Sequence, residues 1–110
     1  MSYPSDPVLT FDASGRMFVI HDHAVANELI DTPDELFEGY DGRGRPVKAQ
    51  GESGEVRLEL SSPLPREAEV RKRVAHYYAV FATRHPTRQP PDEDDLQAFI
   101  QAVADGWIEE

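Results

Sequence analysis

The chain has 110 residues, of which 39% are hydrophobic and 9% aromatic, the size and composition of one folded domain with a single core. It has no cysteine and no apolar run of membrane-spanning length, which excludes disulfides, thiolate chemistry and a helical membrane span, and its first residues lack a signal-peptide pattern. The formal net charge of −10 disfavours contact with phosphate backbones, and we expect a cytoplasmic protein that attracts cationic partners.

The first elements of the chain predict a β-hairpin. Residues 1–7 contain prolines and are expected to form a flexible lead-in. Residues 8–20 predict two strands joined by a tight turn, in which Gly15 is available for a positive φ. The core candidates of this hairpin are Phe11, Phe18 and Ile20.

A short helix is expected after the hairpin, because the spacing of apolar residues changes to four. Val25 and Leu29 form one such pair, and Ala26 and Ile30 form the other. Asp22 is the predicted N-cap, accepting a hydrogen bond from the amide of residue 24 or 25. The helix is expected to end near residue 31, before a Thr-Pro pair that favours extended backbone.

The middle of the chain predicts a helical turn followed by three strands. Residues 32–35, Thr-Pro-Asp-Glu, have the pattern of a capping box. Residues 36–61 predict a meander with hairpin turns at residues 41–42 and 53–54. Its last strand alternates apolar and charged residues, so one face is apolar: Val56, Leu58 and Leu60.

Two amphipathic helices are expected to close the chain. The helix over residues 65–83 has an apolar face made of Val70, Val74, Tyr77, Tyr78 and Phe81. The helix over residues 92–107 begins with four acids at the positive end of the helix dipole, and its apolar face is made of Leu96, Phe99, Ile100, Val103 and Trp107.

Together these elements predict an α+β domain over residues 1–110. Its sheet is expected to be mostly antiparallel with about five strands, a short inserted helix, and the two C-terminal amphipathic helices packed on one face. We expect Val56, Leu58 and Leu60 to lie opposite the helix pair. Leu58→Asp should therefore unfold the domain.

Two histidines flank Asp22 and raise the question of a metal site. On a continuous strand His21 and His23 would point to the same side and supply half of such a site, with His76 or His85 as a third ligand. Because the helical spacing begins at once, the sequence favours the helix cap and predicts no cofactor. A metal-binding protein or metal-dependent enzyme using His21, His23 and His76 stays as an alternative.

Other motifs do not indicate catalysis or nucleic-acid binding. The basic run at residues 71–73 lies four residues after Glu67 and Glu69, the arrangement of ion pairs that solvate a helix face. The glycine-rich stretch at residues 39–44 lacks the lysine of a phosphate loop, and no serine has the pattern of an activated nucleophile. We therefore predict a protein that is not an enzyme and does not bind nucleic acid.

The acidic residues remain as the strongest functional signal. Residues 1–65 hold 12 acidic and 5 basic groups, residues 66–91 hold 2 and 6, and residues 92–110 hold 7 and none. The predicted partner-binding residues are Asp31, Asp34, Glu35, Glu38, Asp41, Asp92, Glu93, Asp94 and Asp95. We expect a monomer or weak homodimer that binds a basic protein, as a bacterial immunity or antitoxin-type inhibitor does. An adaptor subunit of a larger assembly, or an acidic surface that serves solubility alone, are the alternatives.

Overall fold

A computed structural model describes residues 3–82 and 89–107 of the chain. Its strands are β1 (Val8–Phe11), β2 (Met17–Ile20), β3 (Glu38–Tyr40), β4 (Pro46–Gln50) and β5 (Arg57–Leu60). Its helices are α1 (Ala26–Leu29), α2 (Glu67–Val80) and α3 (Leu96–Asp105), with 3-10 turns η1 (His23–Val25) and η2 (Pro33–Glu35). The strands form one antiparallel sheet of order β2-β1-β3-β4-β5, which confirms the predicted α+β class.

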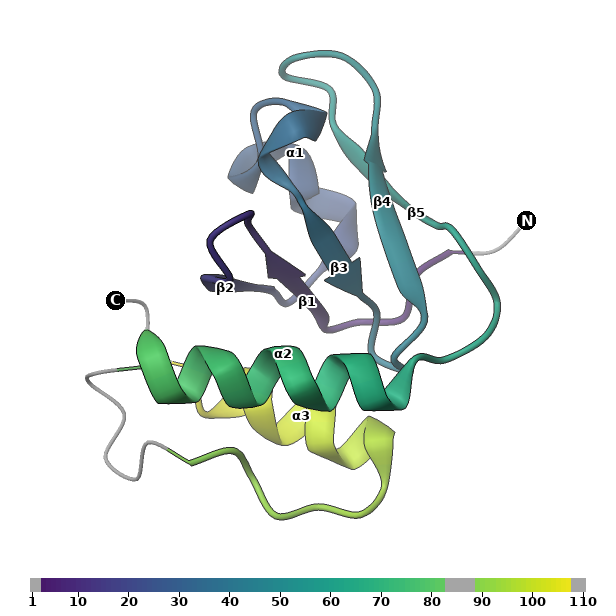
Figure 1. The fold of residues 1–110 in the computed structure, drawn as a ribbon. Helices are drawn as coiled ribbons and strands as arrows, with labels where there is room; N and C mark the ends of the chain where they lie inside the picture. Colours follow the sequence, from purple (N-terminus) through teal and green to yellow (C-terminus); the bar gives the residue numbers. More distant parts are fainter. Residues whose placement is uncertain (1–2, 83–88, 108–110) are drawn as a thin grey trace.

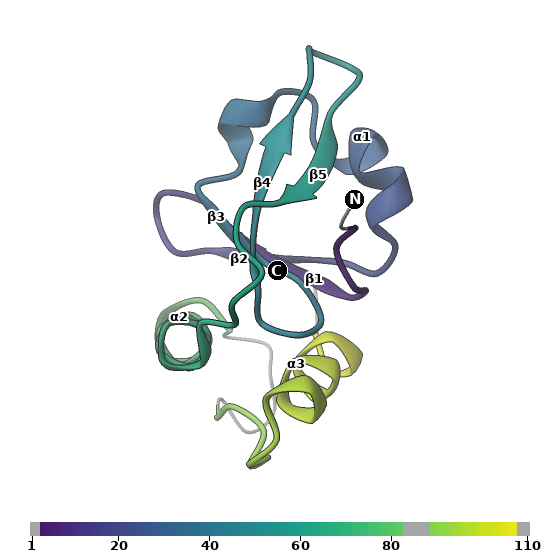
Figure 2. The ribbon, with the colours of Figure 1, turned by 90° about the vertical axis from the view of Figure 1, so that its right-hand side faces the viewer.

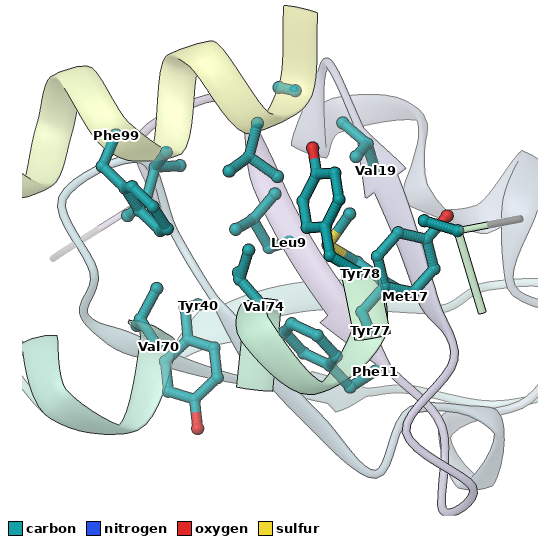
Figure 3. Packing of buried hydrophobic residues seen from close by; sticks show 14 residues of the cluster. Leu9, Phe11, Met17, Val19, Tyr40, Val70, Val74, Tyr77, Tyr78 and Phe99 are labelled. Atoms are coloured by element: carbon teal, nitrogen blue, oxygen red, sulfur yellow. The ribbon is translucent and has the colours of Figure 1, made fainter. Parts of the chain in front are cut away.

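The helices α2 and α3 lie side by side against one face of the sheet, as expected (Figures 1 and 2). A first core cluster fills the space between them and strands β1 to β3, and Figure 3 shows its side chains. The largest side chains buried there include Leu9, Phe11, Tyr40, Tyr77 and Tyr78. These residues come from both ends of the sequence, so this cluster joins the helix pair to the sheet.

A second core cluster lies away from the helix pair and corrects one expectation. Leu58 and Val56 pack there with Ile20, Ala26 and Ile30. The apolar face of β5 is therefore buried as the alternation predicted, but it faces the short helix α1 and not α2 and α3. Each face of the sheet therefore has its own core cluster. The helix pair covers one face, and the very short helix α1 covers part of the other.

The β1–β2 hairpin forms as predicted, with one error in its core. Gly15 has a φ of 95°, and Phe11 and Ile20 are almost fully buried. Phe18, however, is 43% exposed. It pairs with Thr10 on the same face as Ile20, but α1 has only four residues and covers Ile20 while leaving Phe18 open.

The helix cap at Asp22 is confirmed, since its Oδ1 accepts a hydrogen bond from the Ala24 amide at 2.9 Å.

Only one of the two apolar pairs expected on the short helix is buried. Ala26 and Ile30 face the second core cluster, whereas Leu29 is 60% exposed and Val25, four residues earlier, is exposed with it. A helix of this length presents one narrow face to the sheet, so the second pair points outward.

Two turns differ in detail from the expected chemistry. The turn at residues 33–35 forms, but Thr32 makes no side-chain cap bond, and the Glu35 carboxylate accepts from the Asp31 amide at 3.0 Å. In the β3–β4 turn the positive φ belongs to Gly44, at 82°, and not to Gly42. Gly42 is required for close approach instead, because a Cβ at this position would lie 2.5 Å from the Asp6 carbonyl oxygen, and its amide donates to the Ser5 carbonyl at 2.6 Å.

The expected lead-in is anchored where the structure describes it. The Ser5 amide donates to Asp41 at 2.9 Å, and Pro4 and Pro7 are buried. None of the described helices is long and apolar enough to cross a bilayer.

Candidate functional site

An open hollow lies between the β1–β2 hairpin and the short helix α1, and we call it the α1 groove. Its volume is about 730 Å³, within the range of pockets that enclose drug-sized ligands. It exists because α1 is too short to cover the part of the sheet beside it. The main apolar side chains that line it are Phe18, Ile20, Val25, Leu29, Leu36 and Trp107.

Three large apolar side chains in the α1 groove remain in contact with solvent. Phe18 is 43% exposed, Val25 37% and Leu29 60%. Single exposed apolar side chains are ordinary on a monomer, but a group that lines one hollow is typical of a binding surface. Covering them would be favourable by about 25 cal/mol for each Å² of apolar surface removed from water.

The charged side chains that line the α1 groove are all acidic. They are Asp12, Asp22 and Glu35, which we call the acidic rim. His21 also lines the groove, and none of the described lining residues is a lysine or arginine. The sequence accounts for this, since residues 17–42 contain neither. The groove therefore favours a ligand or partner that is apolar and positively charged.

Asp12 is fixed in the hairpin turn. Its Oδ1 accepts from the amides of Ser14 at 2.9 Å and Arg16 at 3.1 Å, and from the Ser14 hydroxyl. Burial raises the pKa of Asp12, but the hydrogen bonds from Ser14, Arg16 and Gly15 together outweigh it, so the pKa lies below its ordinary value. This carboxylate is ionised and correctly placed before any partner arrives.

The other two rim carboxylates are held by local backbone in the same way. Asp22 is the cap of η1, and Glu35 accepts from the amide of Asp31. All three side chains thus use one oxygen for an amide of their own segment, and the charge remains available to a cation. A partner that binds here would not have to order these side chains first.

Trp107, the single tryptophan of the chain, lines the α1 groove just after α3 ends. Its indole Nε1 is buried and has no hydrogen-bond partner, alone among the buried side-chain nitrogens and oxygens of the described residues. Leaving a buried donor without an acceptor costs about 1–3 kcal/mol. Trp107 therefore lines the groove with a side chain whose buried indole donor is unused.

The structure separates the acidic residues that were expected to bind a partner. Glu35 reaches the α1 groove, and Asp31 and Asp34 lie on exposed backbone around the same turn, which packs against β4. Glu38 is half-buried in β3. The C-terminal group, which precedes α3, lies in the helical layer away from α1 (Figure 1) and consists of Asp92, Glu93, Asp94 and Asp95.

The C-terminal acidic group has local structural roles. Asp95 caps α3 by accepting from the Ala98 amide at 2.9 Å, and the Asp94 carbonyl accepts from Arg71 Nη2 at 2.9 Å. Arg71 also pairs with Glu67 at 2.9 Å, as the spacing on α2 predicted. The two acidic groups therefore do not form one continuous surface.

Asp41 has to be removed from the expected partner-binding set. It is 0% exposed, and its carboxylate accepts hydrogen bonds from the Ser5 amide and the Arg45 guanidinium. Its role in this conformation is to hold the β3–β4 turn and the N-terminal segment together.

The three histidines of the metal alternative lie apart. His21 lines the α1 groove, while His23 Nδ1 lies 2.9 Å from Asp6 Oδ1. His76 lines a different hollow of about 340 Å³ against α2, beside Gly15. His85, the other candidate, lies outside the described residues.

Among the described residues one group of three potential metal ligands occurs, and it is Asp6, Asp22 and His23. It shares only His23 with the set expected from sequence. Asp6 Oδ1 already accepts from the His23 amide at 2.8 Å, and Asp22 Oδ1 caps η1. The arrangement is explained by these hydrogen bonds.

Sequence reasoning missed the α1 groove, although one signal pointed to it. The sequence has two apolar pairs in one short segment, Val25–Leu29 and Ala26–Ile30, and a helix of four residues cannot bury both of them against one sheet.

The chain matches no protein-family model, no curated protein and no solved structure. The function of the groove therefore has to be argued from its own chemistry.

Proposed function

We propose that this protein is a small acidic protein-binding module that occupies a basic site on a partner protein, as immunity and antitoxin-type inhibitors do. The observation that carries the proposal is the α1 groove, where exposed apolar side chains line the same hollow as three carboxylates, and none of the described lining residues is a lysine or arginine. An acidic surface that served only solubility would have no need of Phe18 and Leu29 in contact with water.

The energetic division of labour in such an interface supports this function. Apolar side chains that become buried supply affinity, while unlike charges at the edge accelerate association and select the partner. The α1 groove combines both in one hollow, because its lining contains Phe18, Val25 and Leu29 together with the three carboxylates of the acidic rim. A basic segment of another protein that projects into the groove is the complementary surface.

The proposal can be tested by photo-crosslinking in cells that produce the protein. A photoreactive phenylalanine analogue replaces Leu29 in the groove, and Leu64, which is 70% exposed and does not line the groove, serves as the matched control position. We expect a dominant adduct with a basic protein from position 29 and not from position 64. The adduct should be lost when Asp12, Asp22 and Glu35 are changed to Asn, Asn and Gln.

The inhibitor function needs a second measurement on the identified partner. The activity of the partner should fall in proportion to the amount of the acidic protein that is added, and it should be abolished at a one-to-one ratio. A partner that stays fully active when saturated would instead be a neighbour in an assembly, which is the adaptor alternative. Equal adducts at positions 29 and 64, or none at 29, would contradict partner binding through the groove.

A further inference from the structure

We infer that the partner enters the α1 groove as a cationic amphipathic helix, with its apolar side chains against Phe18, Val25 and Leu29 and its lysines or arginines at the acidic rim. This inference rests on the proposed function, and it adds the form and chemistry of the bound segment. An amphipathic helix in an apolar groove is one of the common modes of peptide recognition.

The edge of the sheet beside the groove does not favour the main alternative, an added β-strand. β2 is an edge strand, but Met17 is only 2% exposed and Val19 only 5%. A strand can be added only where the backbone groups of the edge are accessible. The partner must therefore bind through side chains projecting into the groove, which a helix provides.

The groove is suited to several anchoring side chains. Its volume of about 730 Å³ is in the range that holds a drug-sized ligand, which is larger than a single aliphatic side chain. One turn of a helix places residues three and four apart on the same face, so two or three apolar residues can enter together. Their contacts would cover Phe18 and Leu29, the two most exposed apolar side chains of the lining.

Charge complementarity selects the occupant. The rim carries three carboxylates that are already held by backbone amides, and the described lining contains no lysine or arginine. A second copy of this chain has a net charge of −10, which opposes its approach to the acidic rim. A helix with basic residues flanking an apolar stripe is the partner that this surface fits.

Trp107 provides a direct readout, because it is the single tryptophan and lines the groove. The probe is an end-blocked peptide of about 14 residues made only of leucine and lysine, with leucines at helical spacing. A second peptide has the same composition in strictly alternating order, which favours a strand. A third has the helical order with glutamate in place of lysine.

We expect the helical lysine peptide to change the Trp107 fluorescence saturably and to bind about tenfold tighter than the alternating peptide, with the glutamate peptide inactive. D12N/D22N/E35Q should weaken binding about tenfold while keeping the amide caps, since Asn and Gln also accept hydrogen bonds. The matched variant E52Q/E55Q/E59Q has the same net charge of −7 and should bind within about twofold of the wild type.

The apolar contact is tested by Leu29→Ser against Leu64→Ser, both at exposed positions. Only the first should weaken binding. Equal effects of the two triple variants, or equal effects of the two serine variants, would mean general attraction to an acidic protein and would overturn the inference. Tighter binding of the alternating peptide, or no peptide binding, would also overturn it. The proposed function fails separately, if position 29 gives no adduct in cells.

Discussion

The carboxylate of Asp41 lies 2.7 Å from Nη2 of Arg45, and the Asp41 side chain is 0% exposed. The same carboxylate accepts from the amides of Ser5, Arg43 and Arg45. One buried charge thus organises the β3–β4 turn and attaches the N-terminal segment to it. A residue that looked like part of an acidic surface in the sequence is a structural centre in the fold.

Removing this carboxylate should destabilise the domain strongly. Asp41→Ala leaves the half-buried Arg45 guanidinium without its counter-charge and several amides without an acceptor, a loss of about 3–5 kcal/mol in the free energy of unfolding. Urea denaturation followed by circular dichroism measures it. Asp34→Ala, at an exposed position, is the control and should change stability by less than about 0.5 kcal/mol. Similar losses in both variants would contradict the structural role of Asp41.

Two neighbouring apolar residues at the end of α1 should separate stability from binding. Ile30 is 7% exposed and belongs to the second core cluster, whereas Leu29 is 60% exposed in the α1 groove. Ile30→Ala should cost about 2–4 kcal/mol by leaving a cavity, and Leu29→Ala should cost less than about 0.5 kcal/mol. Thermal and urea unfolding compare the two. A large loss for Leu29→Ala would mean that this side chain belongs to the core and that the groove is not open.

The sheet and the long helices were predictable because each has a strong local pattern. Apolar and charged residues alternate around Leu58, as the period of a strand requires. Apolar residues recur three and four apart on α2, from Val70, and again on α3, around Phe99, as the period of a helix requires. The partner of each apolar face was not predictable. A period states which residues share a face, but only the three-dimensional arrangement of the strands decides that β5 faces α1 and not α2.

The candidate site was less predictable than the fold. Of the acids of the rim, Glu35 was expected to bind a partner, Asp22 was predicted only as a helix cap, which it also is, and Asp12 had no predicted role. The apolar part of the groove consists of side chains that no other element of the described fold covers. Phe18 is a normal core residue in the sequence, and it is exposed only because α1 ends after four residues.

The corrected position of Leu58 leads to a third prediction. Leu58→Ala should cost about 2–5 kcal/mol, and the loss should be local to the second core cluster. Hydrogen exchange should therefore show increased opening of α1 and β5, with α2 and α3 protected as in the wild type. Val74→Ala, in the first core cluster, should give the opposite pattern. If Leu58→Ala instead lowered the protection of α2 and α3 selectively, Leu58 would pack against the helix pair, as the sequence predicted.

The last prediction concerns the hydroxyl of Tyr40, which donates to Glu69 and accepts from Arg73 Nε at 3.0 Å. Burial raises the pKa of Tyr40 well above its ordinary value, the hydrogen bond to Glu69 adds to this, and Arg73 only partly opposes it. The folded protein therefore holds this proton more tightly than the unfolded chain does. The contribution of this hydroxyl to the free energy of unfolding is fully present below the unfolded pKa of about 10. It is lost as the pH rises toward the folded pKa, by about 1.4 kcal/mol per pH unit.

Tyr40→Phe removes this titrating group and should flatten the decline in the free energy of unfolding above pH about 10. At neutral pH the same variant should lose about 1 kcal/mol for the missing hydrogen bonds, so the wild type and the variant converge as the pH rises. Urea denaturation across the alkaline range gives both slopes. Tyr3→Phe, at a position 65% exposed, is the control and should run parallel to the wild type. If Tyr40→Phe also runs parallel, the hydroxyl ionises as easily in the folded protein as in the unfolded chain, and the enclosed pairing with Glu69 does not persist in solution.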